Sequence, residues 1–203
     1  MTDTLRPPLI LASASVSRAN VLAGAGLSFR SEPSHCDEDA IKDRMKTARA
    51  PTADVAESLA REKTAIISAR YPKSYVIGAD QMLECAGAWL DKPKDMEEAR
   101  SHLQILRGQT HHLVSATVIM VDRQCVWRHA DQAHLTMRSF SDEFIDTYLA
   151  FVGEEVCRSV GAYQLEGMGA QLFSKIEGDY FSILGLPLLP LLNFLREQGI
   201  LSE

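Results

Sequence analysis

The chain begins with a strand pattern that is followed at once by a helix pattern, and this pairing constrains the fold more than any other feature. Residues 8–13 form an apolar run that is typical of a buried strand. Residues 16–25 have helical spacing, and Gly26 is placed to close that helix. Small residues join the two patterns. The sequence therefore predicts a strand that turns tightly into an exposed helix start.

The rest of the chain continues to alternate between helix and strand patterns, with no internal repeat. We expect, in order, a short strand at 28–33, a loop with at most a helical turn at 34–51, a helix at 52–71, a strand at 74–79, a hairpin at 84–90 turning at Ala86-Gly87, a helix at 92–108, strands at 110–122 and 125–138, a helix starting at Ser141, a glycine-rich section with strand character, and a helix at 187–198. This order predicts a mixed α/β fold with a long antiparallel pair and no boundary between two independent domains.

Composition excludes several classes of protein. The 203 residues are 46% hydrophobic and 24% charged, which is ordinary for a globular protein with a sizeable core. The formal charge of -6 argues against a nucleic-acid binder with a broad basic surface. We expect no membrane span and no leader in MTDTLRPPLI. The cysteines lack CxxC spacing, so we expect neither a zinc site nor a disulfide framework. We expect the protein to be located in the reducing cytoplasm.

The helix start at residue 16 is a candidate anion site. Its first backbone N–H groups lack partners within the helix and carry partial positive charge. Ser13, Ser15 and Ser17 can add hydroxyl donors, and Arg18 can bind a phosphate through two parallel hydrogen bonds. The alternative is that a serine only caps the helix and Arg18 is solvated. The residues alone leave both interpretations open.

The helix predicted after Thr52 places a lysine among apolar residues. At about 100° per residue, Lys63 falls roughly 80° from Val55, between Leu59 and Ile67. A lysine in that position has to extend its ammonium group to solvent or meet an anion. One interpretation is a lysine at a sheet edge, and the other is a lysine that points at a phosphate.

Carboxylates follow the predicted strand and loop. Asp80 comes after the apolar run 74–79, and ligands of α/β proteins commonly lie at the carboxyl ends of strands. Asp80 is thus a candidate metal ligand or general base, with a capping aspartate as the alternative. Asp37 and Glu38 supply further carboxylates, although a charged run is usually a solvated face. Lys92 is another possible phosphate contact.

Other chemistry has little support in the sequence. The motifs of a nucleophile elbow, a P-loop and a dinucleotide-binding loop are all missing. His111 and His112 are neighbours at a strand start, so they face opposite ways, and we expect both to be structural or solvated. The remaining candidates share one logic, in which cations and a helix start bind a polyphosphate and carboxylates bind a divalent metal.

The order of these motifs resembles the Maf family of nucleotide pyrophosphatases nearly from end to end. The matching blocks are LILASAS..R at 9–18, PS..DE at 33–38, SLAREKT at 58–64, VIGADQ at 76–81, LDKPKDMEEAR at 90–100, LRGQTHHLVSATVI at 106–119, GAYQLEGMGAQLFSKIEGDY at 161–180 and GLPL at 185–188. The resemblance implies a single domain over residues 1–203, with a mixed, twisted sheet flanked by helices and a nucleotide cleft like that of inosine triphosphatase.

The resemblance also implies an activity. Such proteins are cytoplasmic enzymes, often homodimers, that cleave a nucleoside triphosphate to the monophosphate and pyrophosphate with Mg or Mn. They are thought to remove non-standard nucleotides, and some are linked to arrest of cell division. By this match Asp80, Glu38 and Lys63 are catalytic, and Asp80 and Glu38 hold the metal. The phosphate-binding residues of the family correspond to Ser13, Arg18, Lys63 and Lys92, and Ser15 at the helix start is a further substrate-binding candidate.

Three positions bear on the base. A dTTP- and UTP-specific group of the family has arginine, threonine and glutamine where this chain has Ser17, Gln81 and Glu166. A 7-methyl-GTP group has glutamine and glutamate at the last two positions, although EGDY and Tyr163 are closer to the first group. A carboxylate accepts from guanine N1–H and amino donors. We therefore expect Gln81 and Glu166 to bind the base and 7-methyl-GTP to be the substrate.

Alternative functions stay open on the sequence alone. One is a dTTP and UTP pyrophosphatase. Another is a nucleotide-binding regulator of septum formation that needs no turnover, and a third is a sugar-nucleotide or phosphate-ester enzyme on a similar scaffold.

Overall fold

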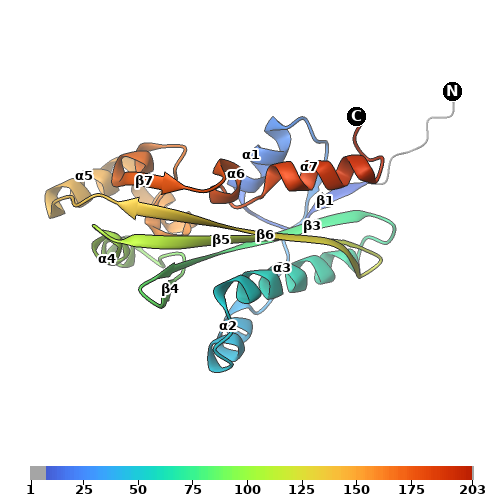
Figure 1. Ribbon diagram of the computed structural model, residues 1–203, viewed down its shortest axis with the longest axis horizontal. Coiled ribbons are helices and arrows are strands. Elements are labelled where there is room, and N and C mark those ends of the chain that lie inside the picture. Colours follow the sequence, from blue (N-terminus) through green and yellow to red (C-terminus); the bar gives the residue numbers. More distant parts are fainter. Residues whose placement is uncertain (1–7, 203) are drawn as a thin grey trace. The chain divides into compact units, whose positions relative to one another are not determined.

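The computed structural model describes residues 8–202, and Figure 1 traces its elements. The expectation that no leader precedes the domain falls largely on residues 1–7, outside the described residues. The helices are α1 Val16–Gly24, α2 Glu38–Thr47, α3 Thr52–Ser68, α4 Met96–Leu106, α5 Asp142–Val152, α6 Tyr180–Ile183 and α7 Leu188–Glu197, with 3-10 turns η1 Gly153–Arg158, η2 Val160–Ala162 and η3 Met168–Leu172. The strands are β1 Leu9–Leu11, β2 Arg30–Ser31, β3 Tyr75–Cys85, β4 Ala88–Leu90, β5 Thr110–Val121, β6 Gln124–Met137 and β7 Phe173–Glu177.

The strands of residues 8–202 form one open, mixed seven-stranded sheet. Its order is β2-β1-β3-β5-β6-β7, and β4 pairs with β3. Strand β1 is parallel to β2 and β3, with Leu9 opposite Tyr75, whereas β4 is antiparallel to β3. Figure 1 labels most of these strands and the helices between them along the chain. The predicted mixed α/β class is confirmed.

The chain divides into two compact units. The first unit comprises the residues up to Asp80, Ser115–Asp131 and the residues from Gly185 on. The second unit comprises Gln81–Val114 and Gln132–Leu184. Strands β3, β5 and β6 each contribute residues to both units, and the division falls between Asp80 and Gln81 within β3.

The core of the first unit lies between β1, β3 and α3. A cluster of Ile10, Ala12, Ile67 and Val76 is almost completely buried. Helix α3 buries the face that its periodicity predicts, including Val55, Leu59 and Ile67. Helix α2 packs against α3. Burial of this apolar face, rather than helix propensity, holds α3 on the sheet.

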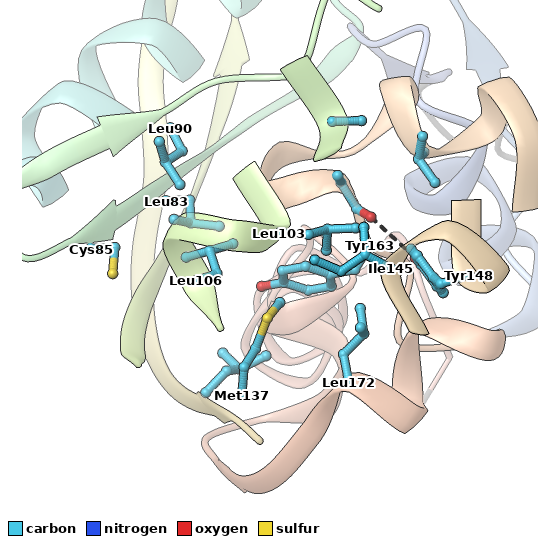
Figure 2. Packing of buried hydrophobic residues seen from close by; sticks show 14 of the residues in the cluster. Leu83, Cys85, Leu90, Leu103, Leu106, Met137, Ile145, Tyr148, Tyr163 and Leu172 are labelled. Carbon is cyan, nitrogen blue, oxygen red and sulfur yellow. Dashed lines mark hydrogen bonds between the residues drawn. The ribbon is translucent and has the colours of Figure 1, made fainter. Parts of the chain in front are cut away.

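The core of the second unit contains two tyrosines. Figure 2 shows Tyr148 and Tyr163 among the aliphatic side chains of this cluster. The labelled aliphatic and sulfur-containing members are Leu83, Cys85, Leu90, Leu103, Leu106, Met137, Ile145 and Leu172. Helices α4 and α5 contact each other beside this cluster.

Several predicted turns and caps are confirmed. Strands β5 and β6 are joined at Asp122 and Arg123, which both have positive φ and so favour a tight hairpin turn. Ser141 caps α5, since its Oγ accepts a hydrogen bond from the Phe144 backbone N–H at 3.3 Å. The β3–β4 hairpin turns at Ala86 and Gly87. Within residues 8–202, no helix combines the length and apolar character that crossing a membrane requires.

Three predictions were wrong. Residues 38–47 form a ten-residue helix, α2, rather than a loop, because Asp37 caps it and it packs against α3. The glycine-rich section contains mainly 3-10 turns, with only β7 as a strand. Strand β3 does not end at residue 79 but continues to Cys85, where it pairs with β4. Asp80 therefore lies within a strand and not beyond its end.

Candidate active site

A network of hydrogen bonds surrounds the helix start that is predicted to bind an anion. Ser15 is the N-cap of α1, and its Oγ accepts from the Arg18 backbone N–H at 3.3 Å. The Ser15 backbone N–H donates to Ser13 Oγ at 3.2 Å. Arg18 Nη1 donates to the same Ser13 Oγ at 3.2 Å. The structure thus brings Ser13, Ser15 and Arg18 together at the end of β1.

Arg18 is held from its other side by a residue that the sequence did not single out. Its Nε donates to the Gly185 carbonyl oxygen at 2.9 Å. Gly185 has φ of +95°, in the left-handed region that favours glycine. A Cβ there would lie 3.2 Å from Arg18 Nε. Burial lowers the pKa of Arg18, and the charges of Asp80 and Glu38 oppose that shift, so the guanidinium lies near both carboxylates.

Lys63 is the centre of the candidate site. Its ammonium group forms an ion pair with Asp80 on β3 and a second, at 2.9 Å, with Glu38 at the start of α2. The Lys63 and Asp80 side chains are only 12% and 9% exposed. Burial tends to lower the pKa of Lys63, but attraction to Asp80 and Glu38 outweighs it and raises the pKa above its usual value. Lys63 is therefore a permanent cation between two carboxylates.

Gly78 explains how α3 comes close enough for this contact. A Cβ on Gly78 would overlap Thr64 Oγ1 and lie 2.9 Å from the Ala60 backbone oxygen. The absence of a side chain lets one turn of α3 rest directly on β3, two residues before Asp80. Thr64 Oγ1 donates to the Ala60 oxygen at 2.5 Å, which keeps that hydroxyl on the helix. The sequence signal was a glycine within an apolar strand, which marks a close backbone approach.

The loop before α2 supplies Glu38 and uses its neighbour for a different purpose. Asp37 Oδ1 accepts from the Ala40 backbone N–H at 3.0 Å, so Asp37 is the N-cap of α2. Glu38 follows it and reaches Lys63. Cys36 lies in the same loop, and burial is the main cause that raises the pKa of its thiol, against the opposing effect of Lys63. The thiol therefore stays protonated at neutral pH.

The remaining sequence candidates lie in the second unit. Gln81 Nε2 donates to the carbonyl oxygens of Ser182 and Ile183, at 3.2 and 3.0 Å, in α6. Lys92 follows β4, and Glu166 lies between η2 and η3. The Gln81 amide group thus donates to backbone carbonyl oxygens at the end of α6, which lack partners within the helix.

The donor set bears on whether a divalent cation fits. Among the described residues, no group of three or more His, Cys, Asp or Glu side chains is arranged to hold a metal ion. Asp80 and Glu38 share one cation, Lys63, so this pair of carboxylates already accommodates positive charge. Mg²⁺ typically uses one or two carboxylates together with substrate phosphates. The residues present fit that kind of metal and do not form a complete cage.

Comparison with known proteins identifies the family. The family model described as Maf-like protein matches residues 8–198. A nucleoside triphosphate pyrophosphatase of Paramagnetospirillum magneticum is 52% identical over 190 residues, covering 94% of this chain and 98% of that protein. A 7-methyl-GTP pyrophosphatase of Rhizobium johnstonii is 50% identical over 198 residues, covering 98% and 100%. The chain therefore belongs to the Maf family, as the ordered sequence blocks indicated.

Proposed function

We propose that this protein is a nucleoside triphosphate pyrophosphatase, a hydrolase that acts on an acid anhydride. The observation that carries the proposal is Lys63, held between Asp80 and Glu38 near Arg18 in one unit of a Maf-family chain. Phosphoryl transfer has two requirements: cations that bind the phosphates, and carboxylates that accept or donate a proton. Relatives of about the same length are named for this activity.

The reaction follows from these groups. A water oxygen bonds to the α-phosphorus, and the bond from that phosphorus to the bridging oxygen of the β-phosphate breaks. Asp80 accepts the proton of the attacking water, and pyrophosphate leaves with the electron pair of the broken bond. The Lys63 ammonium orients Asp80 and stabilises negative charge as it develops. Arg18, Ser13 and Ser15 bind the phosphate chain.

We further propose that Mg²⁺ or Mn²⁺ is the cofactor and that Asp80 and Glu38 hold it. Both ions prefer hard oxygen ligands, which is the chemistry that this pair offers. When bound, such an ion neutralises phosphate charge. Titration calorimetry with MnCl₂ tests this without turnover. Binding to the wild type that is lost in Glu38→Gln supports the assignment, and equal binding to both contradicts it.

Within this class, we propose 7-methyl-GTP as the preferred substrate, with Glu166 as the direct contact to the base. A carboxylate accepts hydrogen bonds from guanine donors and attracts the positive charge of the methylated ring. The Nε2 group of Gln81 donates to α6, so a contact between Gln81 and a base has to use its acceptor oxygen. Lys92 is a candidate phosphate contact.

A product assay tests this function. The protein is incubated with Mg²⁺ or Mn²⁺ and with 7-methyl-GTP, GTP, dTTP, UTP or CTP, and monophosphate and pyrophosphate are measured. Preference for 7-methyl-GTP supports the proposal. Preference for dTTP and UTP keeps the reaction but overturns the base assignment. If no nucleotide is hydrolysed but nucleotides still bind tightly, the result favours a nucleotide-binding regulator instead.

We also propose that the protein acts as a homodimer in the cytoplasm. The four free cysteines of the described residues are consistent with a reducing compartment. Light scattering at several concentrations tests the dimer, since a mass near 22.5 kDa throughout would mean a monomer.

A further inference from the structure

His111 is a buried titratable residue that the proposed chemistry does not use. It lies on β5 in the second unit and is completely buried. Its Nε2 is 2.8 Å from the Tyr163 hydroxyl, whereas its Nδ1 has no hydrogen-bond partner among the described residues. Burial, with a smaller effect of His112, lowers the pKa of His111 to about 4, so the ring is neutral at pH 7. A neutral, half-satisfied polar ring in a core has a desolvation cost.

The surroundings of this pair are closely fitted. The Tyr163 ring meets Phe173 edge to face, with ring centroids 4.9 Å apart. The centroids of the His111 and Phe173 rings are 6.0 Å apart. Gly161 leaves room for the tyrosine, since a Cβ there would lie 2.8 Å from Tyr163 Cε1 and 2.6 Å from Leu83 Cδ1. The Tyr163 ring, visible in Figure 2, therefore has one arrangement in this core.

Tyr163 follows η2 and directly precedes the turn that carries Glu166. That turn closes on itself, because the Gly167 N–H donates to the Gln164 carbonyl at 3.3 Å. Gly169 lies so near that a Cβ on it would be 2.9 Å from the Gln164 backbone nitrogen. The turn is thus compact, and its direction depends on how the residue before it, Tyr163, is anchored.

Two hydrogen bonds anchor the chain before the turn, one to the backbone and one to a side chain. Tyr148 donates its hydroxyl to the Ala162 carbonyl at 3.1 Å, which fixes the backbone (the dashed line in Figure 2). His111 bonds instead to the side chain of Tyr163. A directional bond inside an apolar core specifies one orientation, whereas apolar packing alone tolerates several.

We propose that His111 is a positioning residue that, through Tyr163, fixes the turn carrying Glu166 and thereby sets the discrimination between nucleobases. The last step rests on the proposed function, because it takes Glu166 as the base contact. The first step, the anchoring of the turn, rests only on the contacts of the second unit.

The test compares two variants with a matched control. Tyr163→Phe removes only the hydroxyl, and His111→Leu removes the ring nitrogens. His102 is the control, since it is another buried histidine of the second unit, on α4, whose Nδ1 also lacks a partner among the described residues. The measurements are the ratio of kcat/KM for 7-methyl-GTP to that for UTP, and hydrogen exchange of the peptide 163–170.

We expect both variants to lower the substrate ratio by about tenfold, mainly through a higher KM for 7-methyl-GTP. We also expect about tenfold faster exchange in peptide 163–170. The double variant should be no worse than the more affected single variant, because both remove one bond. His102→Leu should reduce stability while leaving the ratio and this peptide within about twofold.

The outcomes separate the two steps. An unchanged ratio and unchanged exchange in both variants overturn the proposal. Faster exchange with an unchanged ratio overturns the role in base discrimination and leaves His111 as an anchor only. If the wild type releases no pyrophosphate from any nucleotide, the proposed function is refuted. Faster exchange in the two variants would still support the anchoring of the turn by His111.

Discussion

Gly78→Ala is predicted to damage the candidate site from a position that carries no functional group. The new Cβ would overlap Thr64 Oγ1 and lie 2.9 Å from the Ala60 backbone oxygen. The hydroxyl is the end of a side chain, but the Ala60 oxygen belongs to the helix and moves only with it. Overpacking of this kind costs about 1–3 kcal/mol. For a chain of this size we expect a Tm lower by about 2–4 °C per kcal/mol.

The same displacement should reduce turnover more than stability alone explains. Lys63 precedes Thr64 on α3, so a shift of the helix moves its ammonium group away from Asp80. A misplacement of about 1 Å can lower kcat by about a hundredfold. Urea unfolding and pyrophosphate release under saturating nucleotide measure the two effects separately.

Gly24→Ala is the matched control for this experiment. Gly24 ends α1, and a Cβ there would meet no atom within 4 Å. It should be neutral or stabilising by about 0.5–1 kcal/mol, because alanine favours a helix. Adding Thr64→Ala to Gly78→Ala should restore part of the stability by removing one of the two overlaps. Wild-type stability and kcat in Gly78→Ala would refute the reasoning.

Three further predictions concern single side chains. Asp80→Asn should lower kcat by about 10²–10⁴-fold while circular dichroism stays native, and near-normal turnover would remove Asp80 from the mechanism. Glu166→Gln should reduce the preference for 7-methyl-GTP over UTP without abolishing turnover, which a two-substrate kinetic comparison checks. His111 has a pKa of about 4 in the fold, below its ordinary value near 6.5, so its contribution to stability is complete above pH ~6.5 and is lost as pH falls toward 4. Between pH 7 and pH 5 the wild type should lose roughly 2 kcal/mol more unfolding free energy than His111→Leu, and parallel curves in urea titrations would contradict this.

Local periodicity predicted the elements that bury a regular face. Helix α3 was predicted because Val55, Leu59 and Ile67 recur at helical spacing, and all three are buried. The same periodicity singled out Lys63 as a cation that needs an anion or solvent, and the structure places it between two carboxylates. These features depend on residues within a few turns of each other, so the sequence carries them directly.

Features that depend on contacts across the chain were not predictable in this way. Helix α2 buries a single residue, Ile41, so its pattern is weak, and it is stabilised by a cap and by α3. The Gly185 carbonyl reaches Arg18 from the far end of the sequence. His111 and Tyr163 are 52 residues apart. Only the fold shows that such residues meet.

The Maf family blocks contributed what periodicity lacks, namely an ordered set of residues with a shared purpose. They pointed to Ser13, Arg18, Glu38, Lys63 and Asp80, which the structure brings together in the first unit. They gave no account of how Gln81 contacts α6. The roles assigned to Gln81, Lys92 and Glu166 remain predictions.

Hydrolysis of 7-methyl-GTP in water enriched in ¹⁸O, followed by mass spectrometry of the products, tests the central claim most directly. Attack on the α-phosphorus predicts one ¹⁸O atom in the nucleoside monophosphate and none in pyrophosphate. Label in pyrophosphate, or release of orthophosphate in place of pyrophosphate, would contradict it.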